Sequence, residues 1–179
     1  MSPLSSQSTV GQWLSAIETK LHALVGLMSL LLIVTSPWIL MGRRLSPNAN
    51  GWNYWHIYGG LFCALVTVAF TISVCKNGQW RQLYPWLVGD LNQCKQDLLG
   101  LLKGTLPHSG SKGLLSIIAG IGLLLLLLTS LSGVSWYLAQ GSEYAMNLRY
   151  FHMLFAQYFT GVLLLHILCG LLHLRDFFD

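Results

Sequence analysis

The sequence predicts an all-α integral membrane protein, a bundle of four membrane-spanning helices with a cytoplasmic amphipathic helix between the second and third spans. Of its 179 residues, 54% are hydrophobic and only 9% are charged, and the mean hydropathy is +0.57. Such values are typical of membrane proteins rather than of soluble domains. Four windows contain no Asp, Glu, Lys or Arg and are each long enough to cross about 30 Å of hydrocarbon, namely residues 21–41, 55–75, 113–138 and 150–172. Because four spans leave few residues for anything else, we expect a single transmembrane domain over residues 1–179.

The charge and the cysteine content exclude several classes of protein. The net charge of +4 comes without a basic block, so we expect no nucleic-acid partner. The cysteines are dispersed and form no C-x-x-C or C-x-x-C-H motif, so neither covalent c-type haem attachment nor a cysteine-based zinc site is expected. About twenty mostly polar residues precede the first apolar run, which is too long for a signal-peptide core. We therefore expect the first span to remain in the mature protein.

The first span follows a polar segment rich in serine and threonine. Within that segment Trp13, Leu14 and Ile17 predict a short amphipathic turn that leads into the membrane. His22 falls in the first turn of the span, and Pro37 lies near its end.

The second span opens in an aromatic cluster of the kind found where helices enter a bilayer, formed by Trp52, Tyr54, Trp55 and Tyr58. His56 lies inside this cluster. The second span, like the first, therefore carries a histidine near its start.

Residues 76–112 leave the membrane. Apolar residues recur there at helical spacing, which predicts an amphipathic helix on the membrane surface; they are Leu87, Leu91, Cys94, Leu98 and Leu101. His108 follows in a turn, and we expect it to be solvated. The third span contains no histidine, and its small or polar positions are Thr129, Ser130, Ser132 and Gly133.

The fourth span lies in an uncharged stretch of 25 residues between Arg149 and Arg175 and carries His152, His166 and His173. At about 100° and about 1.5 Å per residue, His166 lies within about 40° of the face of His152 and about 21 Å farther along the helix. His173 shares nearly the same face. Histidines are costly in hydrocarbon and usually face the bundle interior, where they serve a function. The spacing therefore predicts two stacked sites at different depths.

The distribution of lysine and arginine predicts that both termini are cytoplasmic. Seven of these residues lie in the two terminal segments and the 76–112 loop, namely Lys20, Lys76, Arg81, Lys95, Lys103, Lys112 and Arg175. The other two loops carry three, namely Arg43, Arg44 and Arg149. In this orientation His56 and His152 lie near the outer side, whereas His22 and His166 lie in the cytoplasmic half. The four histidines thus form two pairs by depth.

Each pair joins two different helices, as two axial ligands on opposite faces of a haem must. Glycines three or four residues after these histidines are expected to leave room for a flat macrocycle, namely Gly26, Gly59, Gly60 and Gly170. Two other interpretations stay open. A zinc or copper site would need three or four donors at one depth, and the histidines could also be isolated hydrogen-bonding residues.

Three cationic residues and His173 each have a functional and a plain interpretation. Arg149 precedes His152 by three residues and is placed either to meet haem propionates on the outer side or to anchor the helix at the interface. Lys20 and Arg175 offer the same choice on the inner side. His173 would donate to a quinone, move a proton or reach towards the headgroups.

These features resemble the di-haem membrane cytochrome b family, which includes the gamma subunit of formate dehydrogenase, the cytochrome b of nickel–iron hydrogenase and bacterial superoxide oxidase. The resemblance covers about residues 20–175, and the His-x13-His-x6-His pattern of the fourth span is its most specific part. Pro107-His108 before the third span is similar to the gamma-subunit type. The chain departs from the family pattern at Thr35-Ser36, where Thr-Gly is expected.

The resemblance implies that the chain holds two b haems, the outer one on His56 and His152 and the inner one on His22 and His166. It also implies electron transfer in the bacterial inner membrane, between a periplasmic dehydrogenase, reductase or cytochrome subunit and the quinone pool of the respiratory chain. Quinone reduction or quinol oxidation would be the chain's only chemistry of its own as part of an oxidoreductase. The alternatives are a stand-alone superoxide:quinone oxidoreductase and a haem-free membrane anchor or assembly protein.

Overall fold

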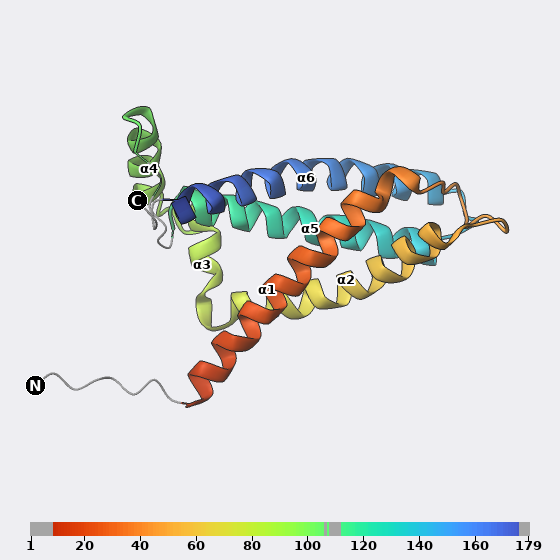
Figure 1. Cartoon of the computed structure of the whole chain (residues 1–179), viewed down its shortest axis with the longest axis horizontal. Helices are drawn as coiled ribbons and strands as arrows, with labels where there is room; N and C mark the ends of the chain where they lie inside the picture. The colour runs from red at the N-terminus through yellow and green to blue at the C-terminus, as the bar shows by residue number, and fades with distance from the viewer. Residues whose placement is uncertain (1–8, 106, 108–111, 176–179) are drawn as a thin grey trace, which may run out of the picture.

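The computed structural model describes residues 9–105, 107 and 112–175, and all regular structure in this part of the chain is helical (Figure 1). Four helices are long and apolar enough to cross a membrane, namely α1 (Thr9–Thr35), α2 (Gly51–Cys75), α5 (Leu114–Leu138) and α6 (Ala145–Arg175). The prediction of an all-α bundle with four spans is therefore confirmed.

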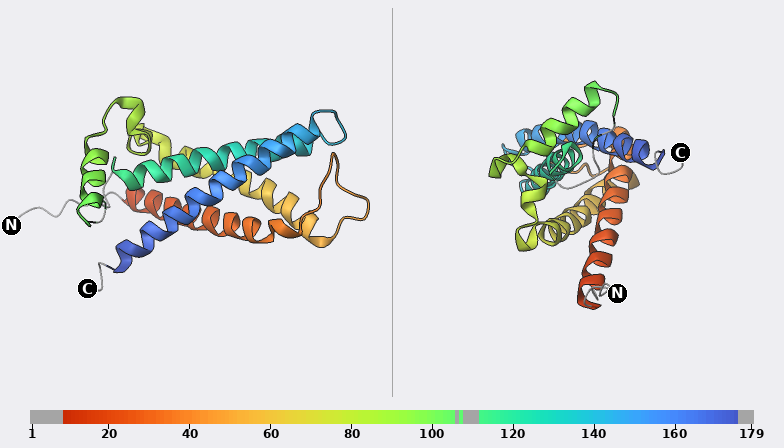
Figure 2. Two further views of the ribbon diagram at one scale, coloured as in Figure 1. Left: turned by 90° about the horizontal axis from the view of Figure 1, so that it is seen from above. Right: turned by 90° about the vertical axis from the view of Figure 1, so that its left-hand side faces the viewer.

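The four long helices lie side by side in the order α1, α2, α5, α6, with α5 and α6 in the most extensive contact. The start of α1 and the end of α6 lie at the same end of the bundle, which we call the inner end, and the loop between α1 and α2 lies at the outer end (Figures 1 and 2). Helix α1 runs obliquely to the others, and its beginning stands apart from α6 (Figure 2).

Helix α1 begins earlier and ends sooner than the sequence indicated. Trp13, Leu14 and Ile17, which the sequence assigns to a short turn leading into the membrane, belong to one continuous helix that starts at Thr9. The helix ends at Thr35, before a 3-10 turn, η1 (Ser36–Trp38), so the first span does not reach residue 41 as a helix. Pro37 has no backbone N–H to donate to the Ile33 carbonyl, four residues earlier. The Ser36 hydroxyl donates to this carbonyl instead, at 2.8 Å.

Two amide side chains fix the start of α2 and the loop before it. Asn50 is the N-cap of α2, and its side chain accepts a hydrogen bond from the backbone N–H of Asn53 at 3.1 Å. The buried Asn53 amide in turn bonds both the N–H and the carbonyl of Leu40, at 3.3 Å each. These bonds hold the extended segment after α1 against the first turn of α2.

The outer loop is also tied to the connection between α5 and α6. The indole N–H of Trp136 donates to the Gly42 carbonyl at 3.2 Å, and the Gly141 N–H donates to the Arg43 carbonyl at 2.9 Å. The Leu45 N–H donates to the side chain of Gln140 at 3.0 Å. The two outer connections therefore form one structured end of the bundle.

At the inner end, the described residues of the connection from α2 to α5 form four short helices. They are η2 (Lys76–Gly78), α3 (Trp80–Leu83), η3 (Pro85–Val88) and α4 (Asn92–Leu102). The expected amphipathic helix is shorter than predicted, because Gly89 adopts a left-handed conformation (φ 72°) and separates Leu87 from α4. Leu91 is the residue that precedes the helix.

The side of α4 that faces the protein is polar. Asp97 is 4% exposed and accepts a hydrogen bond from the Leu114 N–H at 2.8 Å, so it caps α5 in place of Gly113, which has no side chain to do so. Gln93 donates to the other oxygen of the same carboxylate at 2.9 Å. The leucines of α4 are exposed instead, namely Leu98, Leu99, Leu101 and Leu102.

Candidate functional site

Two pairs of histidine side chains from different helices lie close together. His56 of α2 and His152 of α6 have ring centroids 6.2 Å apart and ring planes at 86°. His22 of α1 and His166 of α6 also have ring centroids 6.2 Å apart, with ring planes at 75°. Each pair joins two helices, and α6 contributes one member to both.

The spacing within each pair fits one metal ion between the two rings. A nitrogen–metal bond of about 2.0 Å on each side places the centres of two opposed imidazoles roughly 6 Å apart. Among the residues that the structure describes, no group of three or more His, Cys, Asp or Glu side chains gathers as a metal site. A zinc or copper site built from such a group is therefore not found in the described part of the chain.

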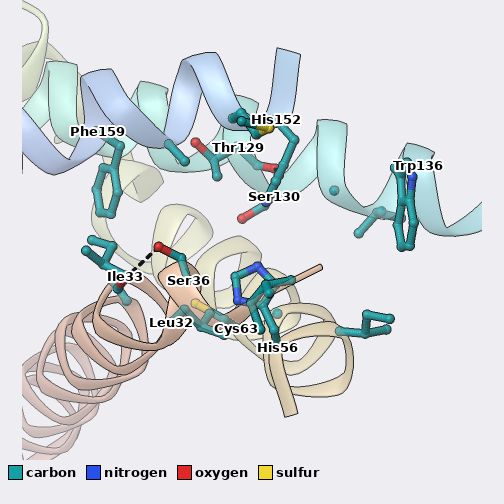
Figure 3. A pocket seen from close by; sticks show the side chains of 18 of the residues that line it. Leu32, Ile33, Ser36, His56, Cys63, Thr129, Ser130, Trp136, His152 and Phe159 are labelled. Carbon is teal, nitrogen blue, oxygen red and sulfur yellow. Dashed lines mark hydrogen bonds between the residues drawn. The ribbon is translucent and has the colours of Figure 1, made fainter. Parts of the chain in front are cut away.

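The outer pair lines a cavity of about 340 Å³ between the four long helices. His56 and His152 project into this cavity from opposite sides (Figure 3). Thr129, Ser130 and Trp136 of α5 also line it. The rest of the wall is mostly apolar. Ligand sites in helical bundles commonly have this character, an apolar cavity with a few convergent polar groups.

The inner pair lines a second cavity, of about 450 Å³. His22 is exposed and stacks on Phe70, with ring centroids 5.6 Å apart, whereas His166 is half-buried. Towards the inner end this cavity is lined by polar side chains, including Glu18, Gln79 and Gln82.

The two cavities share part of their walls. Ser29 of α1, Leu126 of α5 and Phe159 of α6 line both of them. Phe159 and Leu126 are each 7% exposed and belong to the same core cluster. These side chains therefore lie between the two cavities.

Several features of the cavities fit a flat prosthetic group held by the histidines. The Nδ1 atoms of His56 and His166 are buried and have no hydrogen-bond partner, which is costly for polar atoms in apolar surroundings. Gly26 lines the inner cavity and Gly60 the outer one, and a side chain added at either position would meet open space. The residues present therefore fit a haem in each cavity.

Two of the four glycines singled out in the sequence do not lie at the cavities. Gly59 is buried and faces α1, where an added Cβ would lie 3.6 Å from Leu32. The expectation that it leaves room for a macrocycle was wrong, because one residue along a helix rotates the direction by about 100°. Gly170 has open space beside it but lines neither cavity.

The remaining candidate residues divide by position. Arg149 lines the outer cavity, and Lys20 is exposed near the inner end. His173 and Arg175 lie in the last turns of α6, but their side chains are outside the described part of the structure, and His108 is outside the described residues altogether.

One ionic group at the inner cavity was not anticipated. Glu18 lines this cavity, forms an ion pair with Lys76 at 2.9 Å and accepts a hydrogen bond from Ser73 at 3.2 Å. The signal for it was present in the sequence, since Glu18 precedes His22 by four residues and so shares its helix face.

Comparison with known proteins gives one match. A family model described as prokaryotic cytochrome b561 matches residues 14–175. No curated protein and no solved structure matches the chain significantly. The match covers both histidine pairs and all four long helices except the first five residues of α1.

Proposed function

Since the chain belongs to the prokaryotic cytochrome b561 family, whose members are membrane b-type cytochromes that transfer electrons, we propose that it binds two b haems. His56 and His152 are the axial ligands of the outer haem, and His22 and His166 are those of the inner haem. The observation that carries this proposal is the equal spacing of the two pairs, 6.2 Å between ring centroids, each at its own cavity.

The protein residues determine how the two sites work together. A bound b haem supplies a one-electron iron couple, and its potential is set by the axial ligands, by burial and by nearby charge. Ser29, Leu126 and Phe159 line both cavities, so both haems would contact these same side chains. Arg149, at the outer cavity, supplies a positive charge suited to a haem propionate.

We further propose that the outer site exchanges electrons with a periplasmic redox partner and the inner site with the quinone pool, with both termini in the cytoplasm. Reduction of a quinone consumes two electrons and two protons. The inner cavity offers polar groups for this chemistry, because Glu18, Gln79 and Gln82 line it. Among the described residues, no acidic side chain lines the outer cavity.

A second candidate function is a stand-alone superoxide:quinone oxidoreductase. Arg43 and Arg44 are exposed at the outer end and Arg149 lines the outer cavity, and clustered positive charge raises the arrival rate of a small anion such as superoxide. Purified protein that reduces a quinone with superoxide as its only donor would favour this function over that of an electron-transfer subunit.

The experiment that tests the haem proposal is a reduced-minus-oxidised absorption spectrum of the purified protein, with pyridine haemochrome quantitation. We expect a b-type spectrum with two haems per chain. A colourless protein would contradict the proposal and favour a haem-free anchor. One haem per chain would contradict the assignment of a ligand pair to each cavity.

A further inference from the structure

Helix α5 carries no histidine, yet its backbone contacts one of the proposed ligands. The Nδ1 atom of His152 lies 2.9 Å from the backbone carbonyl oxygen of Thr129. A carbonyl oxygen only accepts hydrogen bonds, so the ring nitrogen must be the donor. His152 is then protonated on Nδ1, and its Nε2 has a free lone pair that can bind a metal.

Gly133 provides the space that this contact needs. It lies one helical turn after Thr129 on α5 and therefore on the same face. A Cβ atom added at Gly133 would lie 3.0 Å from both Nδ1 and Cε1 of His152, which is closer than ordinary van der Waals contact. Both atoms belong to a rigid ring, so a larger residue would displace the whole imidazole from the Thr129 carbonyl.

The other half-buried histidines lack such support. The Nδ1 atoms of His56 and His166 are buried without a hydrogen-bond partner. His152 therefore differs both from His56, its partner in the outer pair, and from His166, which lies on the same helix. The difference comes from α5, the helix that packs most extensively on α6.

We propose that Gly133 and the Thr129 carbonyl are positioning elements for His152, which orient its Nε2 towards the iron of the outer haem and lower the potential of that haem. This inference rests on the proposed function. A ligand imidazole that donates its other N–H to an acceptor becomes more basic, and a more basic ligand stabilises ferric over ferrous iron. The contact thus biases electrons away from the outer site and towards the inner one.

The test compares Gly133→Ala with Gly161→Ala by redox titration and by electron paramagnetic resonance of the oxidised protein. Gly161 is the control, because it lies on α6 between His152 and His166, lines neither cavity, and a Cβ added there would meet open space. In Gly133→Ala we expect the potential of one haem component to rise and its resonance signal to shift, while the other component keeps both. In Gly161→Ala we expect neither component to change.

If Gly133→Ala retains both haems with unchanged potentials and signals, the inference is overturned. Should that variant fail to accumulate, solid-state NMR of the reduced wild-type protein decides instead, because reduced low-spin haem is diamagnetic. With 15N-histidine and 13C-carbonyl threonine, we expect a dipolar coupling between His152 Nδ1 and the Thr129 carbonyl carbon. Absence of that coupling in a protein that holds two haems would overturn the positioning role alone, whereas a haem-free wild-type protein would overturn the proposed function.

Discussion

The imidazole rings of His56 and His152 cross at 86°, so the two faces of the outer cavity present nearly perpendicular ligand planes. The rings of His22 and His166 cross at 75°. Parallel planes would have been equally compatible with the spacing between the rings. The crossing angle is therefore an independent property of the two sites, with a spectroscopic consequence.

Perpendicular ligand planes predict strongly anisotropic ferric haems. When axial imidazoles are crossed, the two iron d orbitals that interact with the rings are nearly equal in energy, which increases the g-anisotropy of low-spin ferric iron. We expect electron paramagnetic resonance of the oxidised protein to give two highly anisotropic low-spin signals. Two signals typical of parallel imidazoles would contradict the ring arrangement.

The pairing predicts which substitutions act alike. His56→Ala and His152→Ala should each remove the same redox component, and His22→Ala and His166→Ala the other one, so that haem content falls by about half in every case. The measurement is a redox titration with haem quantitation on protein that remains monodisperse. His108→Ala is the control, because the sequence predicts a solvated residue there. Loss of the same component from His56→Ala and His166→Ala would refute the pairing.

We predict that Glu18, which forms an ion pair with Lys76 at the inner cavity, supplies protons to a quinone. Glu18→Gln removes the ionisable group but keeps the shape of the side chain that lines the inner cavity. We expect the haem spectra to be unchanged and quinone reduction to slow by about 100-fold, the lower end of what a positioned proton donor contributes. The assay is stopped-flow oxidation of the reduced protein by a soluble quinone.

Asp90→Asn is the matched control for Glu18→Gln. Asp90 also forms a partly exposed ion pair, with Lys112 at 2.8 Å, but it lines neither cavity. Either substitution should change the free energy of unfolding by no more than about 1 kcal/mol, because both pairs are partly exposed. Equal quinone rates in Glu18→Gln and wild type would remove Glu18 from the proton route.

We predict that the start of α5 depends on the Asp97 carboxylate of α4. Asp97→Ala leaves the Leu114 N–H without its acceptor, and loss of a side-chain helix cap costs about 1–2 kcal/mol. We expect a corresponding decrease in stability in detergent unfolding, with faster proteolysis of the connection before α5. Gln96→Ala, at an exposed position of α4, should have little effect. Unchanged stability in Asp97→Ala would show that α5 starts independently of this carboxylate.

Much of the fold could be predicted from the sequence, because a membrane demands long charge-free helices. The four windows identify the four long helices, and the match to a cytochrome b561 family model confirms the resemblance to di-haem membrane cytochromes b. The structure brings together His56 with His152 and His22 with His166, the same pairs that helical rise placed at equal depth, although their role as haem ligands stays a prediction.

What could not be predicted depends on contacts between distant segments. In the sequence, Asp97 is one more polar residue of an amphipathic helix, and only the fold shows that it lies beside Leu114. Thr129 and Gly133 are small residues of a span in the sequence, and only the packing of α6 on α5 shows that they contact His152. In the same way, Gly59 and Gly60 are equivalent in the sequence, and only packing against α1 separates their roles.

The shared use of α6 has a consequence for biogenesis. Helix α6 supplies one histidine to each pair, and it is synthesised after α1 and α2, which carry the partner histidines. Neither pair exists during synthesis until α6 has joined the bundle. Under the proposed function, haem can therefore load at either pair only after α6 is in place, and a chain truncated before α6 has no complete pair.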